Sequence, residues 1–351
     1  MKITKLAIAN RGEVAVRIIH ACQELGIQTV LLHSEADVGT RAWRMADEKI
    51  CIGPATTSES YLRIDSNVKG ALSAGAQAIH PGFGFLSENA DFAQSVLDAG
   101  LLFVGPKPQT IRALGDKISA KQLIEKAKVP TVPGYAGVDQ RLETLVDEAA
   151  SIGFPVIVKA AAGGGGRGMK VIRNRNEATE LIASAQREAQ SAFGSSIVFL
   201  EKYLDHAKHI EFQVFGDFTG KCVHLFEREC SVQRRHQKIV EEALSPSLVP
   251  ELRNEMAKAA VALAEKAAYN GAGTVEFMVQ DDHFYFLEMN TRLQVEHPVT
   301  EMVLGVDLVK AQILTAAKEF AIWKQSDLIP RGHAIEARVY AEDPFNRGLP
   351  S

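Results

Sequence analysis

Polar and charged side chains occupy every second position of the segment EMNTRLQVEHP, residues 288–298. They are Glu288, Asn290, Arg292, Gln294 and Glu296, and the first two end an aromatic-rich run, HFYFLEMN, that is typical of a β-strand. Because side chains alternate between the two faces of a strand, Glu288 and Asn290 share one face. Beyond Asn290 the shared face holds only as far as the strand continues.

This run is the second arm of a predicted hairpin, TVEFMVQDDHFYFLEMN, residues 274–290. With a turn centred on Asp282, Glu276 lies opposite Glu288, and directly opposed like charges destabilise a sheet. Two carboxylates and an amide oxygen are suitable ligands for a hard cation, so we expect Glu276, Glu288 and Asn290 to bind Mg²⁺, or Mn²⁺ in its place, together with substrate phosphates. The alternative is a pair of solvated carboxylates on an exposed face.

A run of glycines in AAAGGGGRGMK, residues 160–170, needs a reason, because glycine loses much conformational freedom when it is ordered. Exposed backbone N–H groups can surround phosphate oxygens. The spacing formally matches G-x-G-x-x-G, but the following MKVIRN has the pattern of a strand rather than a helix. A Walker A motif is excluded because Met169 stands where its lysine would be. The pattern favours a phosphate-covering loop between two strands over a flexible surface hairpin.

Basic residues in three other segments need a partner or access to solvent. Lys159 is the one charge of the apolar run PVIVKAA and is costly to bury unless an anion meets it. A lysine whose amine reaches solvent at the strand end is the alternative. The segment SVQRRHQK, residues 231–238, is either an anion site or a solvated loop, and Arg338 is a charge within a strand-like segment.

Composition limits the function classes. The 351 residues carry a formal net charge of −4, which argues against bulk binding of nucleic acid or of anionic membranes. The four cysteines have no metal-binding spacing, and we expect reduced thiols. The sequence has no signal-peptide pattern and no apolar stretch long enough for a membrane span, so we expect a cytoplasmic protein.

The order of elements predicts how these residues are positioned. Residues 1–105 alternate apolar strand-like runs with amphipathic helical stretches, which favours a parallel sheet with helices on both faces. A helical stretch, 107–130, is followed by a compact strand–loop–strand–helix–strand module. From about residue 204 the pattern indicates antiparallel strands, with a helix at 251–269. We found no internal repeats.

Several of these segments together resemble biotin carboxylase, the ATP-grasp component of biotin-dependent carboxylases. They are GGGGRGM, EKYL, HIEFQV, SVQRRHQK, EMNTRLQVEHPVTE and IEARVYAEDP, with IANRGEVAVRI and HPGFGFLSEN near the N-terminus. The resemblance covers essentially the whole chain and implies an α/β and α+β ATP-grasp fold. Its parts would be a Rossmann-like parallel-sheet domain (1–115), a connecting helix (116–130), a mobile lid (131–203) and an antiparallel-sheet domain (204–351). The family domain usually continues further, so we expect the last part to be truncated.

The resemblance also implies residue roles. Bicarbonate would be bound by Lys238, Arg292, Gln294 and the backbone of Val295, and deprotonated by Glu296. Arg338 would stabilise the biotin enolate, and Phe83 stands near biotin where the family often has tyrosine. The metal ligands would be Glu276, Glu288 and Asn290. ATP would be bound by Lys117, Lys159, Gly163, Gly164, Gly165, Gly166, Met169, Glu201, Lys202, Leu204, His209, Gln233 and His236.

The implied reaction is the MgATP-dependent carboxylation of biotin by bicarbonate through carboxyphosphate. The implied partners are a biotin carboxyl carrier protein, a carboxyltransferase component and a second copy of the chain, with no nucleic acid and no membrane. Two alternatives stay open at this point. One is another ATP-grasp ligase, such as a carbamoyl-phosphate type, against which RLQVEHP argues. The other is a truncated module that binds nucleotide without turnover.

Overall fold

The computed structural model describes residues 2–115, 117–161, 169–234, 237–320, 322–343, 345 and 349–350. The chain divides into two compact units. Unit 1 comprises Met1–Val129, Lys208–Phe277 and Leu287–Ser351, and unit 2 comprises Pro130–Ala207 and Met278–Phe286.

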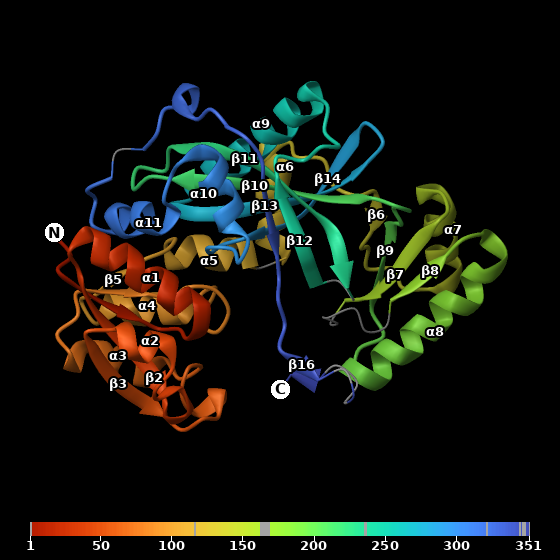
Figure 1. Cartoon of the computed structure of the whole chain (residues 1–351). Coiled ribbons are helices and arrows are strands. Elements are labelled where there is room, and N and C mark those ends of the chain that lie inside the picture. Colours follow the sequence, from red (N-terminus) through yellow and green to blue (C-terminus); the bar gives the residue numbers. More distant parts are fainter. Residues whose placement is uncertain are drawn as a thin grey trace. The chain divides into compact units, whose positions relative to one another are not determined.

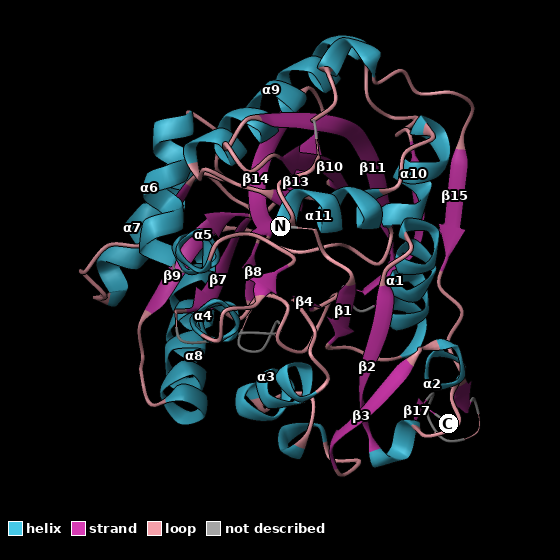
Figure 2. Cartoon of the chain, turned by 90° about the vertical axis from the view of Figure 1, so that its left-hand side faces the viewer, coloured by secondary structure: helices cyan, strands magenta, loops and turns pink. Residues whose placement is uncertain are grey.

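Unit 1 begins with a parallel sheet in the order β3-β2-β1-β4-β5. Its strands are β1 (Lys5–Ile8), β2 (Gln28–Ser34), β3 (Glu48–Gly53), β4 (Ala78–His80) and β5 (Leu102–Phe103). Alternate residues of β1 enter different cores: Leu6 and Ile8 pack with α1 (Gly12–Leu25), whereas Ala7 packs with α3 (Ile64–Ser73) and α4 (Ala90–Asp98). Helices therefore cover both faces of this sheet (Figures 1 and 2). The predicted parallel sheet is confirmed.

Local sequence accounts for the ends of several of these helices. Gly26 adopts the left-handed conformation, with φ of 67°, and ends α1, because glycine tolerates this conformation without strain. The Asn89 side chain accepts a hydrogen bond from the Phe92 N–H and caps the start of α4. The other helical elements here are η1 (Glu35–Asp37), α2 (Arg41–Met45), η2 (Thr57–Glu59), α5 (Pro108–Gly115) and α6 (Lys117–Ala127).

A second sheet, with the strand order β14-β13-β10-β11-β12-β15, forms the centre of the rest of unit 1. The hairpin tip at 278–286 belongs to unit 2. β10 pairs antiparallel with β11, β11 with β12, and β12 with β15. The strands are β10 (Lys208–Gly216), β11 (Cys222–Arg234), β12 (Gln237–Ala243), β13 (Gly271–Gln280), β14 (His283–Asn290) and β15 (Ala334–Ala337). They are accompanied by α9 (Pro250–Lys266), α10 (His297–Leu304), α11 (Leu308–Ala316), η3 (Gln325–Asp327), β16 (Glu342–Asp343) and β17 (Leu349–Pro350). The predicted antiparallel pattern is confirmed, and the predicted helix 251–269 ends earlier, at Lys266.

Unit 2 is a sheet in the order β6-β9-β7-β8 covered by two helices (Figure 1). β7 pairs antiparallel with both β8 and β9, so the strands on either side of the glycine-rich segment are neighbours, as expected. A core of apolar residues from α7, α8 and the sheet holds the unit together. The elements are β6 (Gly134–Tyr135), α7 (Leu142–Ile152), β7 (Val156–Ala160), β8 (Lys170–Ile172), α8 (Arg175–Phe193) and β9 (Val198–Lys202).

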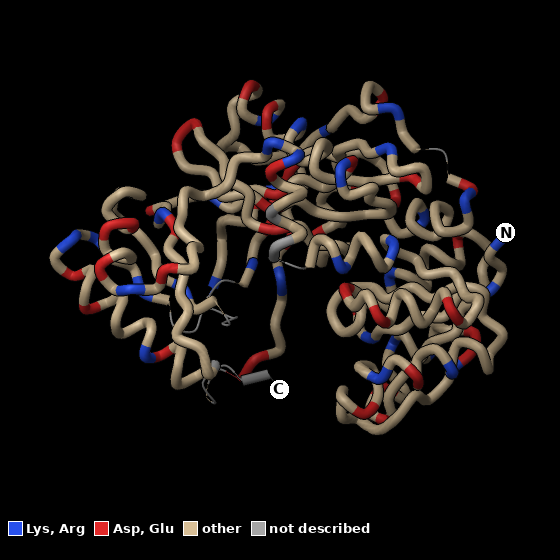
Figure 3. Tube along the Cα trace, turned by 180° about the vertical axis from the view of Figure 1, so that it is seen from behind, with Lys and Arg blue, Asp and Glu red and all other residues tan. Residues whose placement is uncertain are grey.

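Acidic and basic residues are interspersed along the chain (Figure 3), in keeping with the small net charge. Within the described residues no helix is long and apolar enough to cross a membrane. All four cysteines are free thiols; Cys22, Cys222 and Cys230 are buried and Cys51 is exposed.

Candidate active site

Lys238 lies at the centre of a cluster of buried carboxylates in unit 1. From β12 its Nζ donates hydrogen bonds to Glu211 (2.5 Å), Glu296 (2.8 Å) and Glu276 (3.0 Å). The three carboxylates come from β10, from the turn before α10 and from β13. Burial acts against the charged amine, but the carboxylates outweigh it and raise the pKa of Lys238. The lysine is therefore charged, and its amine holds the three carboxylates close together.

Arg228 supports this cluster from within β11 and is completely buried. Its Nε donates to Glu211 at 2.6 Å, on the carboxylate oxygen that Lys238 does not use. Its other bonds go to Gln213 (2.8 Å), Thr300 (2.9 Å) and Thr274 (3.2 Å). A buried charge needs a charged partner and further hydrogen bonds, and Arg228 has both. Glu211 is thus held between two cations.

Glu296, immediately before α10, is completely buried. One of its oxygens accepts from Lys238 and the other accepts from Nη2 of Arg338 at 3.1 Å. Arg338 also donates through Nε to Glu241, at 2.6 Å. A carboxylate in this position can take a proton from a substrate that displaces one of the two cationic donors.

The residues predicted to bind a metal lie together in unit 1. Asn290 Nδ2 donates to Glu276 at 2.6 Å and lies 3.4 Å from Glu288. Partial loss of hydration, together with the neighbouring Glu276 carboxylate, raises the pKa of Glu288 although part of its side chain meets solvent. The Asn290 amide relieves the repulsion between the two carboxylates, and a divalent cation would do the same with the amide oxygen turned towards it. Two carboxylates and an amide oxygen fit Mg²⁺.

His209 and Gln233 extend this region. His209 Nε2 lies 2.5 Å from Glu276, and Gln233 Nε2 lies 2.8 Å from His209 Nδ1. Burial acts against the charge of Glu276, but His209 and Lys238 lower its pKa. Among the described residues two other groups have ligand atoms within 4.8 Å of one another: His209 with Glu211 and Glu276, and Glu211 with Cys230 and Glu296. The Lys238 ammonium bonds to two glutamates in each of these groups, but to one member, Glu276, of the Glu276, Glu288 and Asn290 set. Since the ammonium would repel a cation, that set is the better candidate.

Arg292 lies in the turn between β14 and α10 and contacts several polar groups. Its Nη2 donates to Asn290 Oδ1 (3.0 Å) and its Nη1 to Gln294 Oε1 (3.1 Å). Gln294 in turn donates to Glu276 at 3.0 Å. Glu88 accepts from Arg292 Nε at 2.9 Å and from the Thr291 N–H at 3.0 Å. Because β14 ends at Asn290, these side chains meet through a turn and not through the alternation of a strand.

Unit 2 contains several of the predicted nucleotide ligands. Lys159 on β7 forms an ion pair with Glu201 on the neighbouring strand β9. The amine of Lys202 donates to the carbonyl oxygens of Gly153 (2.7 Å) and Phe154 (2.9 Å), so it holds the turn before β7. Of the two lysines, Lys159 is thus the one whose amine a phosphate could reach.

Other predicted residues fall in loops or outside the described part of the chain. Phe83 is partly buried against the core of unit 1, and its carbonyl oxygen accepts from Asn10 at 2.8 Å. Gly82 beside it has φ of 63°, and a Cβ there would lie 2.9 Å from the Asn10 amide, so the loop requires glycine. Met169 and Leu204 lie in loops of unit 2, and Val295 lies in the turn before α10. The residues outside the description are Gly163, Gly164, Gly165, Gly166 and His236; for Lys117 the description gives the backbone, at the start of α6, but not the side chain.

Four charged residues of the site were not predicted from the sequence: Glu88, Glu211, Arg228 and Glu241. A signal existed for Glu211, which is a charge between two apolar residues of β10, the same pattern that singled out Lys159; Arg228 lies between Glu227 and Glu229 and gave no such signal. The partner of each charge depends on the order of strands in the sheet, which the pattern does not contain.

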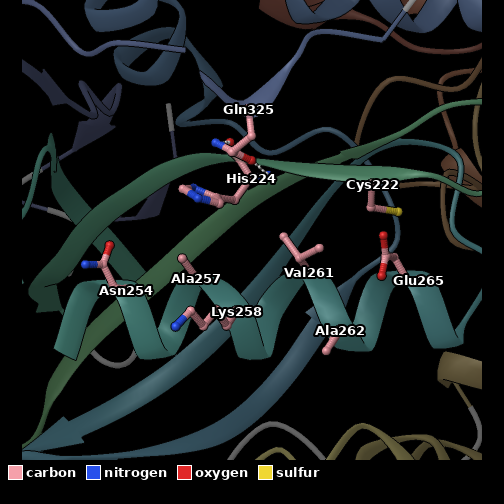
Figure 4. A pocket seen from close by; sticks show the side chains of 9 residues that line it. All are labelled: Cys222, His224, Asn254, Ala257, Lys258, Val261, Ala262, Glu265 and Gln325. Carbon is pink, nitrogen blue, oxygen red and sulfur yellow. Dashed lines mark hydrogen bonds between the residues drawn. The ribbon is translucent and has the colours of Figure 1, made fainter. Parts of the chain in front are cut away.

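A groove of about 510 Å³ lies elsewhere in unit 1, between β11 and α9 (Figure 4). Its lining includes Cys222 and His224 from β11, Val261 and Glu265 from α9, and Gln325. Burial lowers the pKa of His224 to about 4, and Gln325 bonds to the backbone of His224. None of the predicted site residues lines this groove, so the candidate active site is the carboxylate cluster.

Comparisons with known proteins agree with these observations. Residues 2–111 match the family described as "Biotin carboxylase, N-terminal domain", and residues 116–320 match "Carbamoyl-phosphate synthase L chain, ATP binding domain". The chain is 51% identical to a biotin carboxylase of Allochromatium vinosum, over 97% of this chain and 76% of that protein. It is also 51% identical to the mitochondrial methylcrotonoyl-CoA carboxylase subunit alpha of Dictyostelium discoideum, over 99% of this chain and 50% of that protein.

Among solved structures, the chain is similar to the biotin carboxylase domain dimer of Hydrogenobacter thermophilus 2-oxoglutarate carboxylase, in complex with MgADP, ADP and bicarbonate. The TM-score is 0.88 at 47% sequence identity, and the match covers 100% of this chain and 77% of that chain.

Proposed function

The chain belongs to the biotin carboxylase family of ATP-dependent ligases, and we propose that its buried carboxylate cluster activates bicarbonate for the carboxylation of biotin. The observation that carries the proposal is the position of Glu296, whose two oxygens accept hydrogen bonds from Lys238 and Arg338. Bicarbonate bound beside Lys238 would place its hydroxyl against this carboxylate, which is the geometry that a general base requires.

Cationic and amide groups around Glu296 would bind the bicarbonate anion. Lys238 supplies a charged amine, Arg292 a planar guanidinium suited to a carboxylate-like anion, and Gln294 an amide. The backbone N–H of Val295 would complete the set. Since Arg292 already holds Asn290 and Gln294 through its Nη atoms, the three side chains form one connected group into which the anion would insert.

We propose that Glu276, Glu288 and Asn290 hold Mg²⁺ or Mn²⁺. Bound there, the cation would neutralise charge on the phosphates of ATP. The chain's own contribution is a pair of carboxylates kept close together by hydrogen bonds to Asn290, Gln294 and Lys238. The raised pKa of Glu288 supports the assignment, because a cation would offset the repulsion that raises it.

For ATP, the residues of the two units are assigned separately. In unit 2 we propose that Lys159 contacts a phosphate, while Glu201, Lys202 and Leu204 belong to the segment that contacts the adenine. In unit 1, His209 and Gln233 would contact the nucleotide. The remaining assignments, which include the lid role of residues 131–203, stay predictions: Lys117, Gly163, Gly164, Gly165, Gly166, Met169 and His236.

The reaction then has two steps. Glu296 takes the proton of bicarbonate, a bicarbonate oxygen forms a bond to the γ-phosphorus of ATP, and the bond to ADP breaks, which gives carboxyphosphate. Carboxyphosphate releases CO₂ and phosphate; the phosphate takes the ureido N–H proton of biotin, and the enolate adds to CO₂. Arg338 would pair with the enolate, beside Phe83. Exclusion of water matters because carboxyphosphate hydrolyses readily.

The biotin would arrive on a carrier protein, and the carboxylated product would go to a carboxyltransferase. The chain spans about three quarters of the Allochromatium vinosum relative and half of the Dictyostelium discoideum relative. A dimer of two copies is proposed by analogy with the Hydrogenobacter thermophilus domain, which is described as a dimer.

Glu296→Gln tests the proposal, because it keeps the shape of the side chain and removes the base. We expect bicarbonate-dependent phosphate release to fall by about 100-fold or more, with MgADP binding unchanged by calorimetry. Glu242→Gln, on the more exposed side of β12, is the control and should leave both unchanged. Unchanged turnover in Glu296→Gln would refute the assigned base. Phosphate release that ignores bicarbonate would indicate a different ligase, and MgADP binding without any turnover would indicate a binding module.

A further inference from the structure

Arg338 is shared between two buried carboxylates. Its Nε donates to Glu241 at 2.6 Å, and its Nη2 donates to Glu296 at 3.1 Å. The two bonds use different nitrogen atoms of the guanidinium, so either can break while the other remains. The proposed function assigns the enolate to this arginine and the base to Glu296, and it leaves Glu241 without a role.

Glu241 is completely buried on β12, opposite Glu336 of β15. The backbone N–H of Arg338 donates a hydrogen bond to the Ile239 carbonyl oxygen at 2.9 Å. One oxygen of Glu241 accepts from Arg338, and the other has no hydrogen-bond partner among the described residues. Burial and the nearby Glu296 raise the pKa of Glu241, and Arg338 is the cation that opposes the rise. A buried carboxylate with a single cationic partner binds that partner tightly, because losing it would leave an uncompensated charge.

The second carboxylate, Glu296, is a less permanent partner. When it takes a proton from bicarbonate it loses the charge that attracts Arg338, so the Coulomb attraction between the two side chains is lost. Arg338 lies just past the end of β15, next to Val339, which is 95% exposed. A long side chain there would regain its rotamer freedom unless something else held it.

We propose that Glu241 is a positioning residue, which anchors the Nε atom of Arg338 so that its Nη2 atom can exchange Glu296 for the anionic biotin intermediate. This inference rests on the proposed function. Glu241 would not touch bicarbonate, ATP or biotin. It would keep the guanidinium in the site after Glu296 is neutralised, which is when the enolate needs a cation.

Glu241→Gln tests this role, because it keeps a hydrogen-bond acceptor of the same shape and removes only the charge. Carboxylation of free biotin should lose between about 10- and 100-fold in kcat, since a small displacement of a positioning group has effects of that size. Bicarbonate-dependent phosphate release without biotin should stay within about twofold, because the proposed function assigns Arg338 to the enolate and not to the activation of bicarbonate. Glu241→Asp, which keeps the charge, should recover part of the lost rate.

Glu242→Gln is the matched control, since Glu242 is the next residue of β12 and its carboxylate bonds to His333 at 2.9 Å. It should change neither rate. The inference is overturned if Glu241→Gln behaves like this control, or if it lowers both partial reactions equally.

A second measurement does not depend on activity. The Nε–H resonance of Arg338 in an NMR spectrum should move in Glu241→Gln and stay in place in Glu242→Gln. If the unaltered chain releases no phosphate in response to bicarbonate, the proposed function is refuted, and this resonance still decides whether Glu241 anchors Arg338. An unmoved resonance in Glu241→Gln overturns the anchor.

Discussion

Replacing Arg228 by methionine should destabilise unit 1 more than any single surface change. Arg228 is completely buried, and its guanidinium bonds to Glu211 and to three uncharged side chains. Removing one partner of a buried ion pair costs about 3–5 kcal/mol. Lys238 still holds the second oxygen of Glu211 at 2.5 Å, so the carboxylate keeps one cation. We therefore expect a loss at the lower end of the range, about 3 kcal/mol in the free energy of unfolding.

Urea unfolding followed by tryptophan fluorescence measures this loss. The two tryptophans, Trp43 and Trp323, both pack against the core of unit 1, so the signal reports on that unit. With a denaturant slope of about 3 kcal/mol per molar, the urea midpoint should fall by about 1 M. Arg112→Met is the control, since Arg112 pairs with Asp91 in an exposed ion pair and should cost less than about 0.5 kcal/mol.

A double variant separates the ion pair from packing. Arg228→Met combined with Glu211→Gln removes the buried carboxylate as well as its partner, and we expect it to recover about 1–2 kcal/mol of the loss. The reasoning is refuted if Arg228→Met shifts the midpoint no more than Arg112→Met does. It is also refuted if the losses of the two single variants simply add.

Three further predictions concern pH, metal and nucleotide. Burial lowers the pKa of His80 to about 3 and of His297 to about 4, so the unfolded chain binds protons at a higher pH than the folded chain does. The free energy of unfolding should therefore fall by about 2 kcal/mol per histidine between pH 6.5 and 5. A urea midpoint that stays constant over that range would contradict this. Glu288→Gln should weaken Mg²⁺ binding in the presence of ADP by about 10-fold or more in calorimetric titrations, whereas an unchanged affinity would remove Glu288 from the metal site. Lys159→Met should weaken ADP binding and leave the melting temperature of unit 2 nearly unchanged. Lys202→Met should lower that melting temperature, because the Lys202 amine donates hydrogen bonds to two carbonyl oxygens. The opposite pattern would reverse the two assignments.

Local sequence patterns predicted much of the fold. The strands on either side of the glycine-rich segment and the end of α1 at Gly26 follow from hydrophobic periodicity and from the left-handed conformation that glycine tolerates. Glu276, Glu288 and Asn290 came together as the hairpin pattern indicated. These features depend on residues that are close in sequence, so the local sequence pattern was enough to predict them. The roles of Arg292 and Glu296 came from resemblance, because β14 ends at Asn290 and the alternation does not reach them.

Local patterns in the sequence indicate which strands carry charged side chains and which faces of those strands are buried. The pairing of the charges depends on the tertiary fold. Lys238 meets Glu211 from 27 residues away because β10 and β12 lie on either side of β11, and Arg338 meets Glu241 from 97 residues away because β15 lies beside β12. Strand order is set by how all the apolar faces pack at once, and no local periodicity records it. The same buried charges would be destabilising if the strands were ordered differently.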